Sequence, residues 1–174
     1  MPGDTTEISP GRARLYALVA ELGITMPEVS HEAVFTVEEA EAHPHGLPGL
    51  DTKNLFLKDA KDQLFLVTVR ADRRVDMKSL PAVIGSRRLS FGSAERLFDA
   101  LGVTPGSVTP LAMINDTPGR VSFWLDRALA EAEHIVCHPL VNTASVGFNL
   151  PDFLRLMAAM GTKVQIADLD NLPG

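Results

Sequence analysis

The sequence predicts a domain of mixed α/β class, in which strands and helices are interspersed along the chain. Segments with helical spacing of apolar residues alternate with short runs that are typical of strands. Residues 54–69, NLFLKDAKDQLFLVTV, contain two apolar runs on either side of a polar turn, which is the pattern of a β-hairpin. Because a hairpin joins antiparallel strands, the sheet is not entirely parallel, and the class can also be written α+β.

The length of the chain and its overall composition indicate one soluble globular domain. The chain has 174 residues, of which 45% are apolar and 22% charged, and no internal repeat, low-complexity segment or long linker divides it. We therefore expect residues 1–174 to form one domain, with residues 1–34 as an N-terminal helical extension of it. The net charge of −6 argues against general binding to nucleic acid.

Targeting and redox features of the sequence favour a cytoplasmic location. No run approaches the roughly 18 apolar residues of a membrane span. The N-terminal residues lack the apolar centre of a secretory signal. Cys137 is the single cysteine, so it cannot form an internal disulfide, which is compatible with a reducing compartment.

Helices are predicted from capping residues, helical apolar spacing and helix-favouring composition. Ser9 and Ser93 can cap helices, and Gly23 and Gly102 can end them. Pro81 interrupts one of the candidates. The expected helical segments are residues 9–23, 36–43, 76–85, 93–102, 127–133 and 149–161.

Further strands are predicted besides the hairpin. Residues 102–116, GVTPGSVTPLAMIND, indicate a Gly/Pro loop that continues into a strand. Other short apolar runs with strand character lie within residues 88–91, 120–126, 134–139 and 163–169.

Lys53 poses the first functional question, because it lies in the first hairpin strand on the same face as Leu55 and Leu57. Asn54 then faces the other way. Lys53 is either a strand-end residue whose ammonium group reaches water or a charge held at a pocket for a negative ligand.

Residues 69–88 concentrate positive charge, with Asp72 and Asp76 as the only acidic residues among them. The plain interpretation is a solvated surface. The alternative is a local patch that holds a phosphate backbone. The candidate contacts are Arg73, Arg74, Arg87 and Arg88.

Standard catalytic and binding motifs are absent from the sequence, including the phosphate-binding loop, the dinucleotide glycine fingerprint, paired-cysteine zinc patterns and the G-x-S-x-G elbow. His43 and His45 have no third ligand at a recognisable spacing, so we expect no metal site. Cys137 precedes His138, but adjacent side chains of a strand point to opposite faces. We therefore interpret Cys137 as a buried structural thiol rather than a nucleophile.

Three polar segments interrupt apolar or turn sequence and are the candidate site. The first is Thr52–Asn54. The second is the loop Gly106–Pro110, whose glycine allows backbone N–H groups to approach a ligand closely. The third surrounds a turn between strands and contains His138, Asn142, Thr143 and Ser145. Each segment also has a plain structural interpretation, as a strand end, a tight turn or a polar corner.

The segments GLDTKNLFLKD, GSVTPLAMIND and HPLVNTASVGF together resemble the YbaK-like aminoacyl-tRNA deacylases, the editing-domain family related to the insertion domain of bacterial prolyl-tRNA synthetase. The resemblance extends from about Phe35 to Leu169 with the motifs in family order. It is greatest to the free-standing alanyl-tRNA(Pro) deacylases. It implies a single domain with a mixed, largely antiparallel sheet flanked by helices.

The resemblance also implies a reaction, the hydrolysis of alanyl-tRNA(Pro) to alanine and tRNA(Pro). A synthetase pocket cannot strongly reject a smaller amino acid, because one missing methylene changes binding by only about 1–3 kcal/mol. A second site that admits only the small product corrects such errors. The implied partners are the misacylated acceptor end of tRNA(Pro) and, transiently, prolyl-tRNA synthetase.

Site residues are carried over from the family by position. Lys53 matches the functionally required lysine, and Asn54 follows it as in the motif, so both are expected to be catalytic, with Thr52 before them expected to bind substrate. The loop Gly106–Pro110, including Ser107, matches the loop that cradles the terminal adenosine. His138 matches the histidine that shapes the amino-acid pocket, and the same motif contains Asn142 and Thr143.

The implied chemistry requires no protein nucleophile, metal or organic cofactor. In this family the 2′-OH of the substrate is thought to position or activate the water, so the protein has to orient and stabilise. The basic residues Arg73, Arg74, Arg87 and Arg88 become candidates for the acceptor stem. The alternatives are a deacylase for another small amino acid, serine or cysteine, or a non-catalytic nucleic-acid or synthetase-binding module. The presence of Lys53 argues against the last, because a degenerate copy need not keep it.

Overall fold

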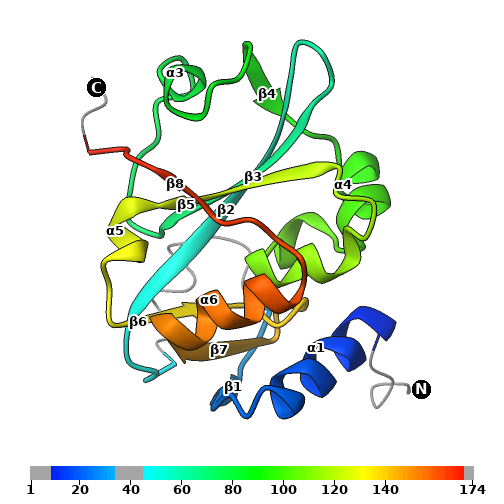
Figure 1. The fold of residues 1–174 in the computed structure, drawn as a ribbon, viewed down its shortest axis with the longest axis vertical. Helices are drawn as coiled ribbons and strands as arrows, with labels where there is room; N and C mark the ends of the chain where they lie inside the picture. Colours follow the sequence, from blue (N-terminus) through cyan, green and yellow to red (C-terminus); the bar gives the residue numbers. More distant parts are fainter. Residues whose placement is uncertain (1–8, 34–44, 171–174) are drawn as a thin grey trace.

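The computed structural model describes residues 9–33 and 45–170, which form an eight-stranded sheet with helices packed against it (Figure 1). The strand order is β1-β7-β6-β2-β3-β5-β8, and β4 pairs with β2 outside this path. The strands are β1 (Glu28–Ser30), β2 (Leu50–Asp59), β3 (Leu64–Arg70), β4 (Leu89–Phe91), β5 (Val121–Asp126), β6 (His134–Cys137), β7 (Ala144–Asn149) and β8 (Gln165–Ala167).

The predicted fold class and the hairpin are confirmed. β2 and β3 pair antiparallel, as do β1 with β7, β2 with β4, and β6 with β7. The pairs β2–β6, β3–β5 and β5–β8 are parallel. The sheet is therefore mixed with an antiparallel majority.

Two helices begin where their predicted capping residues lie. Ser9 and Ser93 accept hydrogen bonds from the backbone N–H groups of Arg12 and Arg96, and Gly102 ends its helix in a left-handed conformation. The candidate helix 36–43 lies outside the described residues. The helices are α1 (Pro10–Glu21), α3 (Leu80–Ile84), α4 (Ala94–Leu101), α5 (Arg127–Ala130) and α6 (Leu150–Ala159), with 3-10 helices η1 (Pro105–Ser107) and η2 (Pro110–Asn115). Among these described helices, none combines the length and apolar character needed to cross a membrane.

The two faces of the β2–β3 hairpin belong to different apolar clusters. Phe56 packs in the larger cluster with residues of α1, α4, η2 and α6. Leu57 packs in the smaller one, with Leu55 against it, together with residues of α3, β3 and β4. The alternation predicted for this strand is therefore confirmed, and each face of β2 contributes to a separate core.

β2 is the element that connects the two ends of the molecule. Figure 1 shows α3 and β4 at one end and β1, β7 and α1 at the other, with β2 running between them. Its first residues pair with β6, residues 52–58 pair with β3, and residues 57–59 pair with β4. Since β3 occupies one edge, β6 and β4 share the other, and residues 52–56 have no strand neighbour there in the described ranges.

Three element predictions need correction. Residues 102–116 contain no strand but two short 3-10 helices, because Pro105 and Pro110 lack a backbone N–H and favour helical turns at their starts. The helix within 76–85 begins only at Leu80, because Asp76 accepts from the Lys78 N–H and the Ser79 hydroxyl and so forms a turn first. Strand β1 was not predicted, because three residues give no recognisable alternation.

Gly49 provides a test of how β2 enters the sheet. Its φ is +117°, and a Cβ there would lie 2.5 Å from the backbone oxygen of His134 on β6. We predict that Gly49→Ala lowers the free energy of unfolding by about 2–4 kcal/mol, from backbone strain plus the clash. The control is Gly161→Ala, where φ is +79° but no atom lies within 4 Å. Urea unfolding of both variants is the measurement, and equal losses would contradict the importance of this close approach.

Candidate functional site

Two of the three predicted polar segments lie at the part of β2 where one edge has no strand neighbour among the described residues: Thr52–Asn54 belongs to β2 itself, and Gly106–Pro110 binds it. Thr52 Oγ1 donates to the carbonyl oxygen of Val136 on β6 at 2.8 Å. Asn54 Nδ2 donates to the carbonyl oxygen of Val108 in the Gly106–Pro110 loop at 2.9 Å. The segment Thr52–Asn54 therefore contacts both the strand that leads to His138 and the loop.

Asn54 has a positioning role that follows from both ends of its amide group. Besides donating to Val108, it accepts from the hydroxyl of Thr68 on β3 at 2.6 Å. Thr68 is fully buried and lies directly opposite Asn54 in the hairpin register. Because its amide is fixed from the strand side, Asn54 holds the loop at a defined position over β2.

The Gly106–Pro110 loop is also fixed from its other side. Its Thr109 is buried and accepts from the backbone N–H of Leu111, which lies in the first turn of η2. The Thr109 hydroxyl also lies close enough to the thiol of Cys137 to influence its ionisation. Ser107 is buried as well, and its N–H donates to the carbonyl oxygen of Thr104.

Cys137 is a structural thiol, as predicted. It is buried, and desolvation raises its pKa to about 12 although Thr109 opposes this effect. A thiol that stays protonated at neutral pH is a poor nucleophile. Cys137 therefore serves packing.

Within the third polar segment, the His138 side chain binds the backbone at the other end of the turn. Its Nδ1 lies 3.0 Å from the carbonyl oxygen of Ala144, the first residue of β7. Because a carbonyl oxygen only accepts, Nδ1 carries the proton. Desolvation lowers the pKa of His138 below its ordinary value, although the Ala144 hydrogen bond opposes this effect. The neutral ring then presents Nε2 as a hydrogen-bond acceptor.

The turn after His138 has an unusual backbone. Leu140 adopts φ of +67° although it has a side chain, and it is buried in the larger apolar cluster. Such a conformation costs of the order of 1–3 kcal/mol and persists only where surrounding contacts impose it. Asn142 is half-buried and Thr143 is exposed, and the carbonyl oxygen of Thr143 accepts from the N–H of His31.

Two further histidines surround His138 and were not grouped with it from the sequence. The His31 ring centroid lies 6.3 Å from that of His138, and His31 Nε2 lies 2.9 Å from Ser145 Oγ. His45 Nε2 lies 2.6 Å from Asp51 at the start of β2. No sequence spacing signals this cluster, because strand pairing brings its members together. Within residues 9–33 and 45–170, no group of three or more potential metal-ligating side chains is arranged to hold an ion.

Lys53 lies between Thr52 and Asn54 on β2, and its side chain points to the other face of the strand from theirs. It is half-buried, it pairs in register with buried Val69, and its face is that of Leu55 and Leu57. Among the described residues, its ammonium forms no hydrogen bond or ion pair. By contrast, Lys58 on the same strand forms an ion pair with Asp62 at 3.6 Å.

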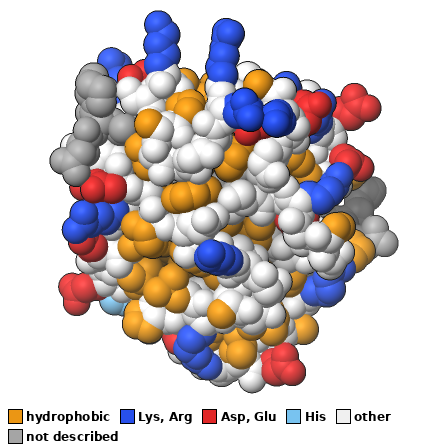
Figure 2. Space-filling view, turned by 45° about the horizontal axis from the view of Figure 1, so that its top comes forward, with side chains coloured by type: hydrophobic (Ala, Val, Ile, Leu, Met, Phe, Trp, Pro, Cys, Tyr) orange, Lys and Arg blue, Asp and Glu red, His pale blue; other side chains and the backbone are white. Residues whose placement is uncertain are grey.

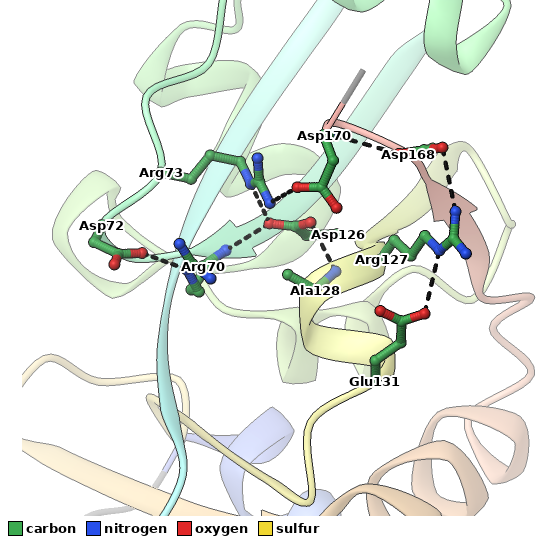
Figure 3. A network of polar contacts seen from close by, with 9 residues as sticks. All are labelled: Arg70, Asp72, Arg73, Asp126, Arg127, Ala128, Glu131, Asp168 and Asp170. Carbon is green, nitrogen blue, oxygen red and sulfur yellow. Dashed lines mark hydrogen bonds and ion pairs between the residues drawn. The ribbon is translucent and has the colours of Figure 1, made fainter. Parts of the chain in front are cut away.

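The basic candidates divide into two groups. Arg73 is only 14% exposed in its side chain and binds Asp126 and Asp170, each at 2.7 Å (Figure 3). Desolvation opposes the charged form of Arg73, but these two carboxylates more than offset it and raise its pKa. Its guanidinium connects the residues after β3 with the end of β5 and with the C-terminal segment. The structure therefore gives Arg73 a role within the fold. Arg74, Arg87 and Arg88 are exposed and form no ion pair with any described residue.

Comparisons with known proteins show the family and the fold. Residues 31–156 match the family model of the aminoacyl-tRNA editing domain. The chain is 40% identical over 148 residues to prolyl-tRNA synthetase associated domain-containing protein 1 of Danio rerio, covering 84% of this chain and 80% of the relative. It is 34% identical over 154 residues to the prolyl-tRNA editing protein ProX of Acetoanaerobium sticklandii, covering 88% and 94%.

One solved structure is described as a candidate trans-editing enzyme for prolyl-tRNA synthetase. It superposes on this chain with a TM-score of 0.66 at 20% identity, covering 93% of this chain and 99% of the other. The fold is therefore shared. The mixed α/β domain with its three polar segments is an editing domain. The chain belongs to the aminoacyl-tRNA editing domain family, and the YbaK-like resemblance of the sequence is confirmed.

The anchoring of the loop by Asn54 can be tested directly. We predict that Asn54→Ala lowers the free energy of unfolding by about 1–3 kcal/mol, because Thr68 loses its acceptor inside the protein. It should also raise amide hydrogen exchange in residues 104–110, since the bond to Val108 is removed. Thr68→Val is the matched control, because it removes the bond between the two strands but keeps the bond to the loop. Equal exchange of the loop in both variants would contradict the anchoring role.

Proposed function

We propose that this protein is a trans-editing deacylase that hydrolyses the ester of alanyl-tRNA(Pro). The observation that carries the proposal is Lys53, a half-buried lysine without a carboxylate partner among the described residues, in a chain of the editing-domain family. Leaving an ammonium unpaired in a half-buried position costs stability and is explained when an anionic or carbonyl oxygen binds there.

The reaction requires few chemical groups from the protein. An aminoacyl ester is already activated, and the ribose supplies a neighbouring hydroxyl that can orient the attacking water. The carbonyl oxygen gains negative charge as water adds, and a nearby ammonium or N–H donor stabilises that charge. Collapse of the tetrahedral intermediate then breaks the bond to the ribose oxygen, which takes up a proton, and releases alanine and tRNA. Lys53 is the proposed electrostatic group.

The other site residues position the substrate in this proposal. The Gly106–Pro110 loop, in which Ser107 and Pro110 are buried, receives the terminal adenosine. Thr52 and Asn54 hold β6 and the loop at fixed distances from β2. His138, with Asn142 and Thr143 in the same turn, borders the amino-acid pocket, where neutral Nε2 can accept a hydrogen bond from the substrate ammonium.

Amino-acid and tRNA specificity separate this proposal from its nearest alternatives. We expect faster hydrolysis of alanyl-tRNA(Pro) than of alanyl-tRNA(Ala), seryl-tRNA or cysteinyl-tRNA under single-turnover conditions. A preference for the seryl or cysteinyl ester would assign the same site to another small amino acid. Binding of tRNA without hydrolysis of any of these esters would instead identify a non-catalytic module.

Lys53→Met removes the charge but keeps most of the apolar stem. We predict that it lowers the single-turnover rate at saturating alanyl-tRNA(Pro) about 10²–10³-fold, the usual effect of removing one group that stabilises an oxyanion. Lys58→Met is the matched control, because Lys58 lies on the same strand and its charge is used by Asp62. Near-normal turnover in a folded Lys53→Met protein would refute the assigned role.

The acceptor stem is proposed to contact Arg74, Arg87 and Arg88, the exposed arginines of the basic segment. Figure 2 shows that Lys and Arg side chains on one face stand singly or in small groups among uncharged and acidic ones. Three separate exposed arginines fit a few phosphate contacts rather than a continuous groove, and such contacts carry little sequence information.

Salt dependence tests this surface. Arg87→Ala/Arg88→Ala should weaken tRNA binding and flatten the slope of log affinity against log salt by roughly 0.7–0.9 for each phosphate that is no longer neutralised. The rate at saturating tRNA should stay unchanged, because uniform binding is removed. The control is Arg120→Ala/Arg127→Ala, which removes the same charge from arginines that pair with Asp99, Glu131 and Asp168. An identical change of slope in both double variants would show that net charge alone is responsible.

A further inference from the structure

The N-terminal helix makes a polar contact with the turn that carries His138. Arg12, in the first turn of α1, donates from Nε to the carbonyl oxygen of Pro139 at 2.9 Å. Pro139 follows His138 directly and precedes Leu140, whose φ is +67°. The Arg12 guanidinium therefore binds the peptide group that leads into the strained residue.

Arg12 is itself held in a fixed orientation. Its Nη2 donates to the hydroxyl of Tyr16 at 3.0 Å, and its guanidinium carbon lies 5.4 Å from the centroid of the Tyr16 ring. Tyr16 in turn donates to the carboxylate of Glu28 on β1, and Glu28 also lies 3.8 Å from Arg12. Desolvation, together with the bond to Glu28, raises the pKa of Tyr16 to about 12, so the hydroxyl remains a donor at neutral pH.

These contacts connect three separate segments around the turn. The Arg12 side chain is only 18% exposed, so its charge is largely enclosed by its partners. β1, which carries Glu28, pairs with β7, where Ala144 accepts from His138. Both ends of the turn from His138 to Ala144 are thus attached to the same unit of α1, β1 and β7.

We propose that Arg12 is a positioning residue of the site, whose planar guanidinium fixes the Pro139–Leu140 peptide and thereby the orientation of the His138 ring. The proposal rests on the proposed function, in which His138 borders the amino-acid pocket. It assigns a role to α1 and β1, which precede the residues 31–156 that match the family model. Lysine cannot replace arginine here, because an ammonium lacks the fork that binds Pro139 and Tyr16 together.

Arg155 offers a matched control within the same chain. It also donates to a backbone carbonyl, that of Leu22 at 2.8 Å, and pairs with Asp152 at 2.9 Å, but it does not contact the His138 turn. Arg12→Gln and Arg155→Gln therefore each remove a bond to a backbone carbonyl oxygen and an ion pair. In urea unfolding we expect the larger loss of folding free energy for Arg12→Gln, because Arg12 is less exposed and also binds Tyr16.

The expected difference lies in His138 and in the chemical step. We expect Arg12→Gln to lower the single-turnover rate at saturating alanyl-tRNA(Pro) roughly 10–100-fold, because small displacements of a positioned group are costly. By NMR titration, the His138 imidazole should titrate at a higher pH than in the wild type, as the loosened turn admits water. Arg155→Gln should change neither quantity, and Arg12→Lys should behave like Arg12→Gln. The titratable groups whose charges act on His138 are His31, His45 and Asp51.

The single-turnover rate and the His138 titration distinguish a failure of the positioning role from a failure of the proposed function. An unchanged His138 titration and an unchanged rate in folded Arg12→Gln would overturn the positioning role, as would equal effects in Arg155→Gln. If the wild type hydrolyses none of the esters while the His138 titration responds as expected, the proposed function fails but the structural coupling stands.

Discussion

The path of β2 is the constraint on which the rest of the structure depends. Its ten residues pair with β6 at one end, with β4 at the other and with β3 along most of their length. Because successive side chains alternate, the same strand contributes Phe56 to one core and Leu57 to the other. The close approach of Gly49 to His134 brings β2 next to β6. The interval between the β6 and β4 pairings is where Thr52 and Asn54 bind their partners.

The site is assembled by side chains that bind main-chain carbonyl oxygens of other segments. Four bonds of this kind are those from Thr52 to Val136, Asn54 to Val108, His138 to Ala144 and Arg12 to Pro139. A bond to the backbone fixes the position of a loop whatever side chain the loop carries. The arrangement therefore places irregular segments on rigid strands, which is what a precise binding site requires.

Local signals predicted the capped helices and the hairpin well, because Ser9, Ser93 and the turn at residues 58–63 act through neighbouring residues alone. The polar segments were also identified, and their order carried the family resemblance. What the sequence could not predict depends on long-range pairing: the short strand β1, the histidine cluster and the ties of Arg12 and Arg73. The loop after Gly102 was assigned a strand because apolar residues of 3-10 turns and of strands look alike over so short a run.

Ion pairs within the fold determine which cationic side chains remain able to bind a ligand. They therefore change part of the interpretation that the clustering of basic residues in the sequence suggested. Arg73 lies in the most basic stretch of the chain, yet Asp126 and Asp170 neutralise it, and Asp126 also accepts from the backbone of Arg70 and Ala128 (Figure 3). Removing Arg73 would leave a buried carboxylate without its counter-charge, so its effect on stability would obscure any effect on tRNA. Lys53 stands apart from the charge cluster and has no carboxylate partner among residues 9–33 and 45–170. Whether a charge has a partner within the fold, rather than the local density of charge, is therefore the better guide to the cations that could bind a ligand.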